Sequence, residues 1–239
     1  MLRVEPIKTE IYRSSKDLID FILENCGDFI KERTILAITS KIVSLSEKRE
    51  VLRSSIEKAE LIKRESDIYL GKAAYDCHLT LKEGLMVASA GIDESNSEEN
   101  HYILYPENPF QSADRIYQEI RSRKGITEFG VLLTDSHCVP FRKGVLGAAL
   151  AYQGFLGVCS QIGEKDLFGR ELKMTQINNA DALAAAATWT MGEGGESCPL
   201  AIIEAQEIEF ALLKDNKDLH MDPKKDLFAP IFKSLDSIL

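Results

Sequence analysis

The chain has 239 residues, a formal net charge of −9, a pI near 5.1 and 44% hydrophobic residues. This composition is that of a globular protein with a sizeable core, and it excludes a disordered chain. The acidic balance argues against broad binding to nucleic acid or to an anionic membrane, because such binding depends on clustered Lys and Arg. No stretch predicts a transmembrane helix or a secretory signal, so we expect a cytoplasmic protein.

The spacing of cysteine and histidine argues against a zinc site. The five cysteines are scattered with no C-x-x-C pair, and the four histidines form no H-x-x-x-H pair. Zinc sites in proteins usually show such spacings. We therefore expect that any bound metal is held by oxygen ligands.

The N-terminal segment predicts a strand followed by a helix. The strand covers residues 2–8, and Ser14-Ser15-Lys16-Asp17 has the pattern of a capping box. In such a box the Ser14 hydroxyl accepts a hydrogen bond from an early helix amide. A helix is expected from this box to about Cys26, with Gly27 ending it.

Residues 34–45 are rich in β-branched and aliphatic side chains, which predicts a strand. Within this stretch, Thr39, Ser40 and Lys41 place two hydroxyls and an ammonium among apolar neighbours. Two interpretations of Lys41 stay open at this point. It contacts a ligand, or it is a lysine at the strand edge that points to water.

A second capping-box pattern opens a charged helix predicted over residues 54–76. The strand predicted over residues 85–90 then leads to Asp93 and Asn96. An acid just past the end of an apolar strand lies where α/β folds gather ligand-binding groups. A turn built from Asp and Asn side chains explains the same residues.

The next helix is predicted over residues 112–124, and the strand predicted over residues 129–134 leads to Asp135 and Ser136. A second apolar strand is thus followed by an acid, here with a hydroxyl beside it. Arg142 and the lysine after it form a basic pair. Such a pair suits a phosphate or a substrate carboxylate, and it is equally able to form a plain ion pair.

The C-terminal third predicts short strands and two helices. Strands are expected within residues 144–159 and over residues 199–205, and a helix capped by Asn178 or Asn179 leads into a glycine-rich turn. A terminal helix is expected over residues 224–239, with four side chains turned inward: Leu227, Ile231, Phe232 and Leu235. No linker or repeat separates independent domains, so residues 1–239 are predicted to form a single domain.

The turn Met191-Gly192-Glu193-Gly194-Gly195-Glu196 carries two carboxylates among three glycines. Glycines let backbone amides approach a ligand closely, while Glu193 and Glu196 repel a phosphate unless a cation lies between them. This pattern favours a metal-phosphate site. A helix C-cap at Gly192 explains it locally as well.

Three acids and one hydroxyl form a candidate metal site: Asp93, Asp135, Glu193 and Ser136. They supply the hard oxygen ligands that Mg²⁺ or Mn²⁺ prefers. Two such ions neutralise the charge that develops in phosphoryl transfer. The sequence has no G-x-x-x-x-G-K-[ST] motif, so no Walker-type P-loop is expected.

Five segments in order carry a family resemblance: residues 90–96, 134–136, 142–144, 166–172 and 191–195. In this arrangement the sequence resembles the coenzyme F420-0:L-glutamate ligase (gamma-glutamyl ligase) family over about residues 4–205. Each motif by itself is weak, but five in register are specific.

The resemblance implies a mixed α/β fold with mixed sheets and two interlocked subdomains, found as a homodimer. It implies GTP or ATP as co-substrate and two divalent ions, Mg²⁺ or Mn²⁺. The metal ligands carried over are Asp93, Asp135, Ser136 and Glu193. The nucleotide contacts are Thr39, Ser40, Lys41, Asn96, Gly192, Gly194 and Gly195. Asp135 and Arg142 are assigned catalytic roles.

The implied reaction joins L-glutamate to a carboxylate acceptor through an acyl phosphate. The sequence departs from the family at Leu45, where a lysine is expected, and at residues 137–139, where a Gly-Arg pair is lost. The acceptor therefore stays open between the deazaflavin F420-0 and a folate, the latter as in a folate-directed bacterial branch. A metal-dependent nucleotide phosphohydrolase and a catalytically silent nucleotide-binding relative are the rival hypotheses.

Overall fold

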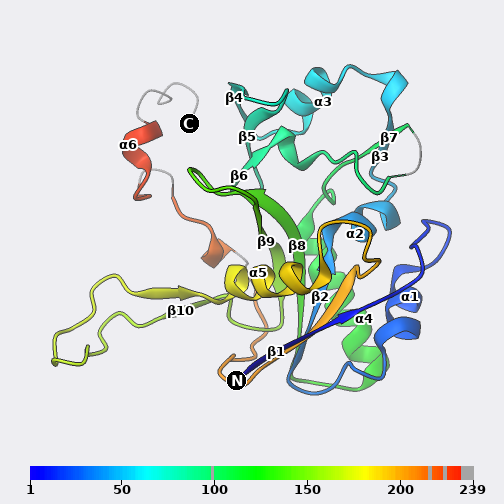
Figure 1. The fold of residues 1–239 in the computed structure, drawn as a ribbon. Coiled ribbons are helices and arrows are strands. Elements are labelled where there is room, and N and C mark those ends of the chain that lie inside the picture. Colours follow the sequence, from blue (N-terminus) through cyan, green and yellow to red (C-terminus); the bar gives the residue numbers. More distant parts are fainter. Residues whose placement is uncertain (98–99, 215–216, 223–224, 233–239) are drawn as a thin grey trace.

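The computed structural model describes residues 1–97, 100–214, 217–222 and 225–232 (Figure 1). Its centre is a five-stranded sheet in which only the third and fourth strands pair in parallel. In spatial order the strands are β1 (Leu2–Ile7), β12 (Leu200–Ala205), β2 (Thr34–Thr39), β8 (Phe129–Cys138) and β9 (Val145–Gln153). The predicted mixed α/β class is confirmed.

Helices cover both faces of this sheet. On one face, α1 (Leu18–Cys26) and α4 (Pro109–Lys124) pack on Leu36 and Ile38 of β2. On the other face, α5 (Asn179–Met191) packs on the alternate residues, Ile35 and Ala37. A strand buried on both faces reads as a continuous apolar run, because successive side chains point to opposite sides.

A smaller part of the molecule lies beside the sheet and has its own hydrophobic cluster, which includes Ile62, Ile92 and Tyr102 (Figure 1). One antiparallel sheet there contains β4 (Ile68–Lys72), β5 (His78–Lys82) and β6 (Leu85–Ala88). The other elements are β3 (Glu50–Leu52), β7 (His101–Ile103), α3 (Lys58–Glu65) and the 3₁₀ turns η1 (Arg53–Ser55) and η2 (Ser89–Gly91). Helix α2 (Ser40–Ser46) follows β2, and its Ile42 and Val43 belong to the main core. The segment after η2 carries Asp93 toward the main sheet.

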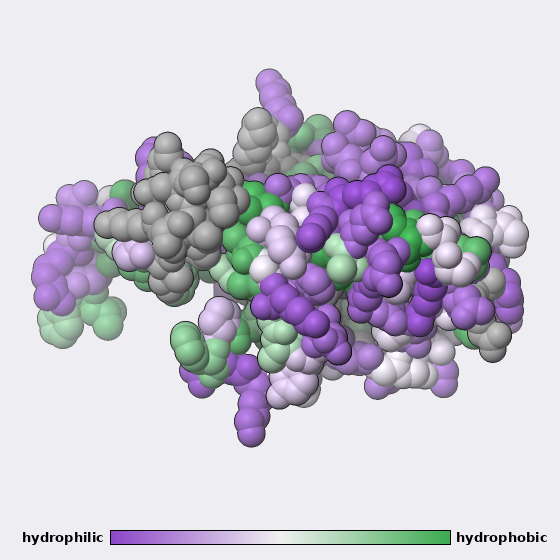
Figure 2. Space-filling view, turned by 90° about the horizontal axis from the view of Figure 1, so that it is seen from above, coloured by the Kyte–Doolittle hydropathy of each residue, from purple (hydrophilic) through white to green (hydrophobic). Residues whose placement is uncertain are grey.

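An arm projects from the body of the molecule (Figure 1). It begins and ends with the paired strands β10 (Val158–Ser160) and β11 (Gln176–Asn178). Leu167 and Phe168 between them are 99% and 84% exposed. Elsewhere, the face seen in Figure 2 is mostly hydrophilic with hydrophobic residues scattered among the others, in keeping with the acidic composition.

Two N-terminal predictions need correction. Helix α1 is capped by Asp17 and not by Ser14, because the Asp17 carboxylate accepts from the amides of Ile19 and Asp20. The strand predicted over residues 34–45 ends at Thr39, and Ser40 begins α2. Apolar residues at both strand and helix spacing occur in this stretch, so composition did not separate the two elements.

The helix predicted over residues 54–76 is also wrong in extent. Only Lys58–Glu65 is α-helical, and residues 68–72 form β4, which pairs with β5. Strand β8 runs four residues beyond its predicted end, to Cys138. The hairpin with β9 supplies hydrogen-bond partners to these extra residues, so Asp135 and Ser136 lie inside a strand.

Of the terminal helix predicted over residues 224–239, the described residues 225–228 are not helical. Leu227, expected to face inward, is 85% exposed, and the described helix α6 covers only Ala229–Phe232. The 3₁₀ turn η3 (Lys217–Leu219) precedes it. Leu235 lies outside the described residues, and the side chains of Ile231 and Phe232 are not described. Within the described part of the chain, no helix is long and apolar enough to cross a membrane.

Candidate functional site

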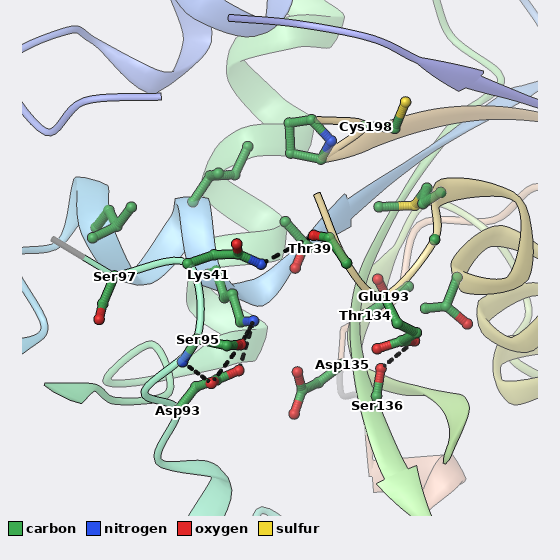
Figure 3. Close-up of a pocket in the computed structure, with 18 of the residues that line it drawn as sticks. Thr39, Lys41, Asp93, Ser95, Ser97, Thr134, Asp135, Ser136, Glu193 and Cys198 are labelled. Carbon is green, nitrogen blue, oxygen red and sulfur yellow. Dashed lines mark hydrogen bonds and ion pairs between the residues drawn. The ribbon is translucent and has the colours of Figure 1, made fainter. Parts of the chain in front are cut away.

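A pocket of about 770 Å³ is lined by segments from both parts of the molecule. Its walls come from the start of α2, the loop after η2, strand β8, the glycine turn after α5 and the N-terminal loop at residues 9–14. The lining includes most of the residues predicted from sequence: Thr39, Lys41, Asp93, Asn96, Asp135, Ser136, Glu193, Gly192, Gly194 and Gly195. The fold thus gathers residues that are far apart in the chain (Figure 3).

Lys41 and Asp93 form an ion pair on one side of the pocket, with Nζ and Oδ2 2.6 Å apart. Ser95 supports it, because its amide and hydroxyl both donate to Asp93 Oδ1, at 2.6 and 2.8 Å. Burial alone raises the pKa of Asp93, but the Lys41 ammonium and the Ser95 donors outweigh it and lower this pKa below its usual value. Lys41 therefore points into the pocket and not to bulk water.

Asp135 lies between that ion pair and the Ser136–Glu193 pair (Figure 3). Its Oδ2 accepts a hydrogen bond of 2.6 Å from the Tyr105 hydroxyl. Ser40 Oγ reaches Oδ1 at 3.4 Å. Burial of the carboxyl raises the pKa of Asp135 to about 6, although the hydrogen bond from Tyr105 acts in the opposite direction. Asp135 is thus a more basic carboxylate than an ordinary aspartate.

The glycine turn is tied to two other segments. The Ser136 hydroxyl donates to Glu193 Oε1 at 2.6 Å, and the Asn96 side-chain amide donates to the Gly194 carbonyl at 3.2 Å. These contacts hold the end of α5 against β8 and against the loop that carries Asp93. The turn therefore closes one wall of the pocket.

Gly192 ends helix α5, as predicted: its amide donates to the Thr188 carbonyl, and its φ is +83°. A Cβ at Gly192 would lie 2.4 Å from the carboxyl carbon of Glu196. Glu196 folds back over the turn, where its Oε2 accepts from the Gly194 amide at 2.8 Å. Glu196 is thus a structural acid of this turn. Its carboxylate binds the Gly194 amide, one of the glycine amides that we expected from the sequence to contact a phosphate.

The donor set has the chemistry that a hard divalent cation needs, since carboxylate and hydroxyl oxygens line the pocket. Each acid nevertheless has its own protein partner: Lys41 for Asp93, Tyr105 for Asp135 and Ser136 for Glu193. Among the described residues, no three His, Cys, Asp or Glu side chains gather closely enough to hold a metal ion. Metal binding by these residues stays a prediction that requires some of them to reorient.

Two predicted site residues do not line the pocket. Ser40 is buried behind it, although its hydroxyl reaches Asp135. Arg142 lies in the exposed turn between β8 and β9. Cys138 and Val145, at the two ends of this turn, line the pocket, whereas Arg142 does not. A catalytic role within this pocket therefore has no support from the position of Arg142.

Sequence reasoning missed Ser95, Tyr105 and the loop at residues 9–14. Ser95 follows Asp93 by two residues. This Asp-x-Ser spacing is a local signal for a turn in which the serine donates hydrogen bonds to the aspartate carboxylate. Tyr105 gave no such signal, because its contact with Asp135 joins separate elements.

At the positions that depart from the family, Leu45 and His137 both line the pocket, and His137 Nδ1 is buried with no partner among the described residues.

The sequence is similar to a family of known glutamate ligases. The model of the family F420-0:Gamma-glutamyl ligase matches residues 6–205. Coenzyme F420:L-glutamate ligase of Methanopyrus kandleri is 31% identical over 249 residues, a match that covers 95% of this chain and 97% of that protein. The proteins of the same name from Methanococcus maripaludis and Methanocaldococcus jannaschii are 37% and 42% identical, over 76% and 62% of this chain and 79% and 58% of theirs.

Proposed function

Because the chain belongs to the F420-0:gamma-glutamyl ligase family, we propose that it is a nucleotide- and metal-dependent enzyme that joins L-glutamate to a carboxylate acceptor. The names of its relatives support the ligase chemistry. The observation that carries the proposal is the pocket, in which Lys41, Asp93, Asp135, Ser136 and Glu193 converge from distant segments. Carboxylates, hydroxyls and one ammonium are the groups that a phosphoryl-transfer site requires.

The reaction proceeds in two balanced steps. An oxygen of the acceptor carboxylate attacks the γ-phosphorus of GTP or ATP, and the bond to the nucleoside diphosphate breaks. The amine of L-glutamate then attacks the acyl carbon of the resulting acyl phosphate, and inorganic phosphate leaves. Two bound Mg²⁺ or Mn²⁺ ions would neutralise phosphate charge in both steps.

The residues of the chain have distinct roles in this scheme. Lys41 provides a positive charge at the edge of the pocket, where it balances phosphate oxygens. Asp93, Asp135, Ser136 and Glu193 are the candidate metal ligands. Burial raises the pKa of Asp135 to about 6 without a cation, whereas a bound cation would stabilise the carboxylate and lower that pKa. Asp135 therefore acts either as a metal ligand or as the base that takes the amine proton, and not as both at once.

The acceptor is a small molecule, either coenzyme F420-0 or a folate. The names of the relatives favour the deazaflavin. The departures at Leu45 and His137 favour a changed acceptor, since both residues line the pocket. A folate presents a pterin ring and a glutamyl carboxylate, so it offers the same reacting group with a different ring.

A mass-shift assay tests the function. The purified chain is given L-glutamate, Mg²⁺ or Mn²⁺, and GTP or ATP, together with F420-0 or with tetrahydrofolate monoglutamate. The proposal expects one acceptor to gain a glutamyl unit. Release of phosphate at full rate without acceptor and glutamate would instead show a phosphohydrolase, and nucleotide binding without acceptor-dependent phosphate release would show a silent relative.

We also propose that the protein is a homodimer. The projecting arm supports this, because Leu167, Phe168 and Met174 expose large apolar side chains that are unfavourable in water. Light scattering of the wild type should give twice the mass of the chain. The Phe168→Asp variant should shift the population toward monomer, while Tyr75→Asp, an equally exposed site outside the arm, should not.

A further inference from the structure

Tyr105 is buried behind the pocket. Only 3% of it is exposed, and it is not among the residues that line the cavity. Its hydroxyl nevertheless donates a 2.6 Å hydrogen bond to Asp135 Oδ2. Tyr105 therefore reaches an acid of the pocket from the protein side, where no substrate touches it.

The surroundings of Tyr105 hold it in this place. Arg49 Nε donates to its carbonyl at 3.0 Å, and Arg49 is itself paired with Glu65. On the other side, Gly91 adopts φ +70°, and a Cβ there would lie 2.1 Å from the Tyr105 ring. The absence of a side chain at Gly91 is what allows the ring to approach Asp135.

The two oxygens of Asp135 consequently differ. Oδ2 is bound to the phenol, whereas Oδ1 has the long 3.4 Å contact with Ser40; the Ser136 backbone amide also stabilises the charged carboxyl. A carboxylate held by one strong donor keeps its orientation, because rotation would break that bond.

We propose that Tyr105 is a positioning residue for the glutamyl-transfer reaction: its hydrogen bond to Oδ2 fixes the orientation of the Asp135 carboxylate in the wall of the pocket. The kinetic part of this inference rests on the proposed function, but the orientation of Asp135 does not. In both respects Tyr105 acts through Asp135, without contact with the reacting atoms. It links the loop after β7 to strand β8, and so joins the two parts of the molecule at the site.

The test is the Tyr105→Phe variant, which removes one hydroxyl and keeps the ring. A crystal structure of the variant should show the Asp135 carboxylate rotated from its wild-type orientation. In the ligation assay, kcat should fall about tenfold or more while KM for L-glutamate stays within about twofold, because a misdirected carboxylate weakens the transition state more than substrate binding.

The matched control is Tyr69→Phe, which loses a 2.8 Å hydrogen bond to His78 Nδ1 outside the pocket. It should leave both Asp135 and kcat unchanged. If Asp135 keeps its wild-type orientation in Tyr105→Phe, or if kcat matches that of the wild type, the positioning role is overturned. If the wild type forms no glutamyl amide, the proposed function fails, and the orientation of Asp135 still decides the role of Tyr105.

Discussion

Lys41 and Asp93 form an ion pair on one side of the pocket, with Nζ and Oδ2 2.6 Å apart. Their side chains are only 23% and 33% exposed, so the pair is screened less than a surface ion pair. It joins the first turn of α2 to the loop after η2. This pair places a positive charge beside the acids of the site.

Replacing Lys41 tests whether that charge holds the nucleotide. We expect Lys41→Met to weaken binding of GTP or ATP about tenfold or more, because phosphate oxygens lose a partly buried cation. Isothermal titration calorimetry measures the change. Lys16→Met removes an exposed ion pair with Glu24 and serves as the control. An unaltered Kd in the Lys41 variant would remove this residue from the nucleotide site.

Asp135→Asn tests the central acid. The amide keeps the shape of the side chain but removes its charge and its basicity, so glutamyl transfer should be lost and metal-dependent nucleotide binding should weaken. The variant should remain folded by circular dichroism, because an amide oxygen still accepts from Tyr105. Turnover at the wild-type rate would exclude Asp135 from the chemistry.

Gly192→Ala tests the conformation of the glycine turn. The added methyl group meets the Glu196 carboxyl, and φ of +83° is unfavourable for alanine. We expect a loss of about 1 to 3 kcal/mol in the free energy of unfolding, measured with urea. Gly195→Ala is the matched control, since a Cβ there meets nothing within 4 Å and its φ is not positive. Equal stabilities of the two variants would contradict the strain at Gly192.

Cys26 predicts a pH dependence of stability. Burial raises the pKa of its thiol from 9.0 to about 12 in the folded state. Between these values the unfolded chain loses this proton while the folded chain keeps it, so the free energy of unfolding falls as pH rises above 9, by up to about 1.4 kcal/mol per pH unit. The contribution is fully present below pH 9.

Urea unfolding of the wild type and of Cys26→Ala between pH 8 and pH 10.5 measures this dependence. The variant loses packing at every pH, but its stability should fall less steeply above pH 9 than that of the wild type. Parallel curves for the two proteins would show that Cys26 ionises equally in both states.

Local patterns in the sequence determined the main elements and most of the site. The apolar run of β2 predicted a strand because both faces of that strand are buried, and Gly192 predicted the end of α5 because its amide closes the last turn. Asp93, Asp135 and Glu193 were found because each follows or interrupts an apolar or glycine-rich segment, and such motifs are continuous in the chain.

Only the tertiary structure decided how those motifs meet. Strand β8 extends past Asp135 because β9 pairs with it, and Arg142 lies in the turn of this hairpin, which does not line the pocket. Tyr105 reaches Asp135 because Gly91 leaves room for its ring, a contact between elements that share no local pattern. Motifs formed by neighbouring residues can thus be predicted from the sequence, because their spacing along the chain is fixed. Strand pairing and side-chain contacts between distant segments depend on the packed fold.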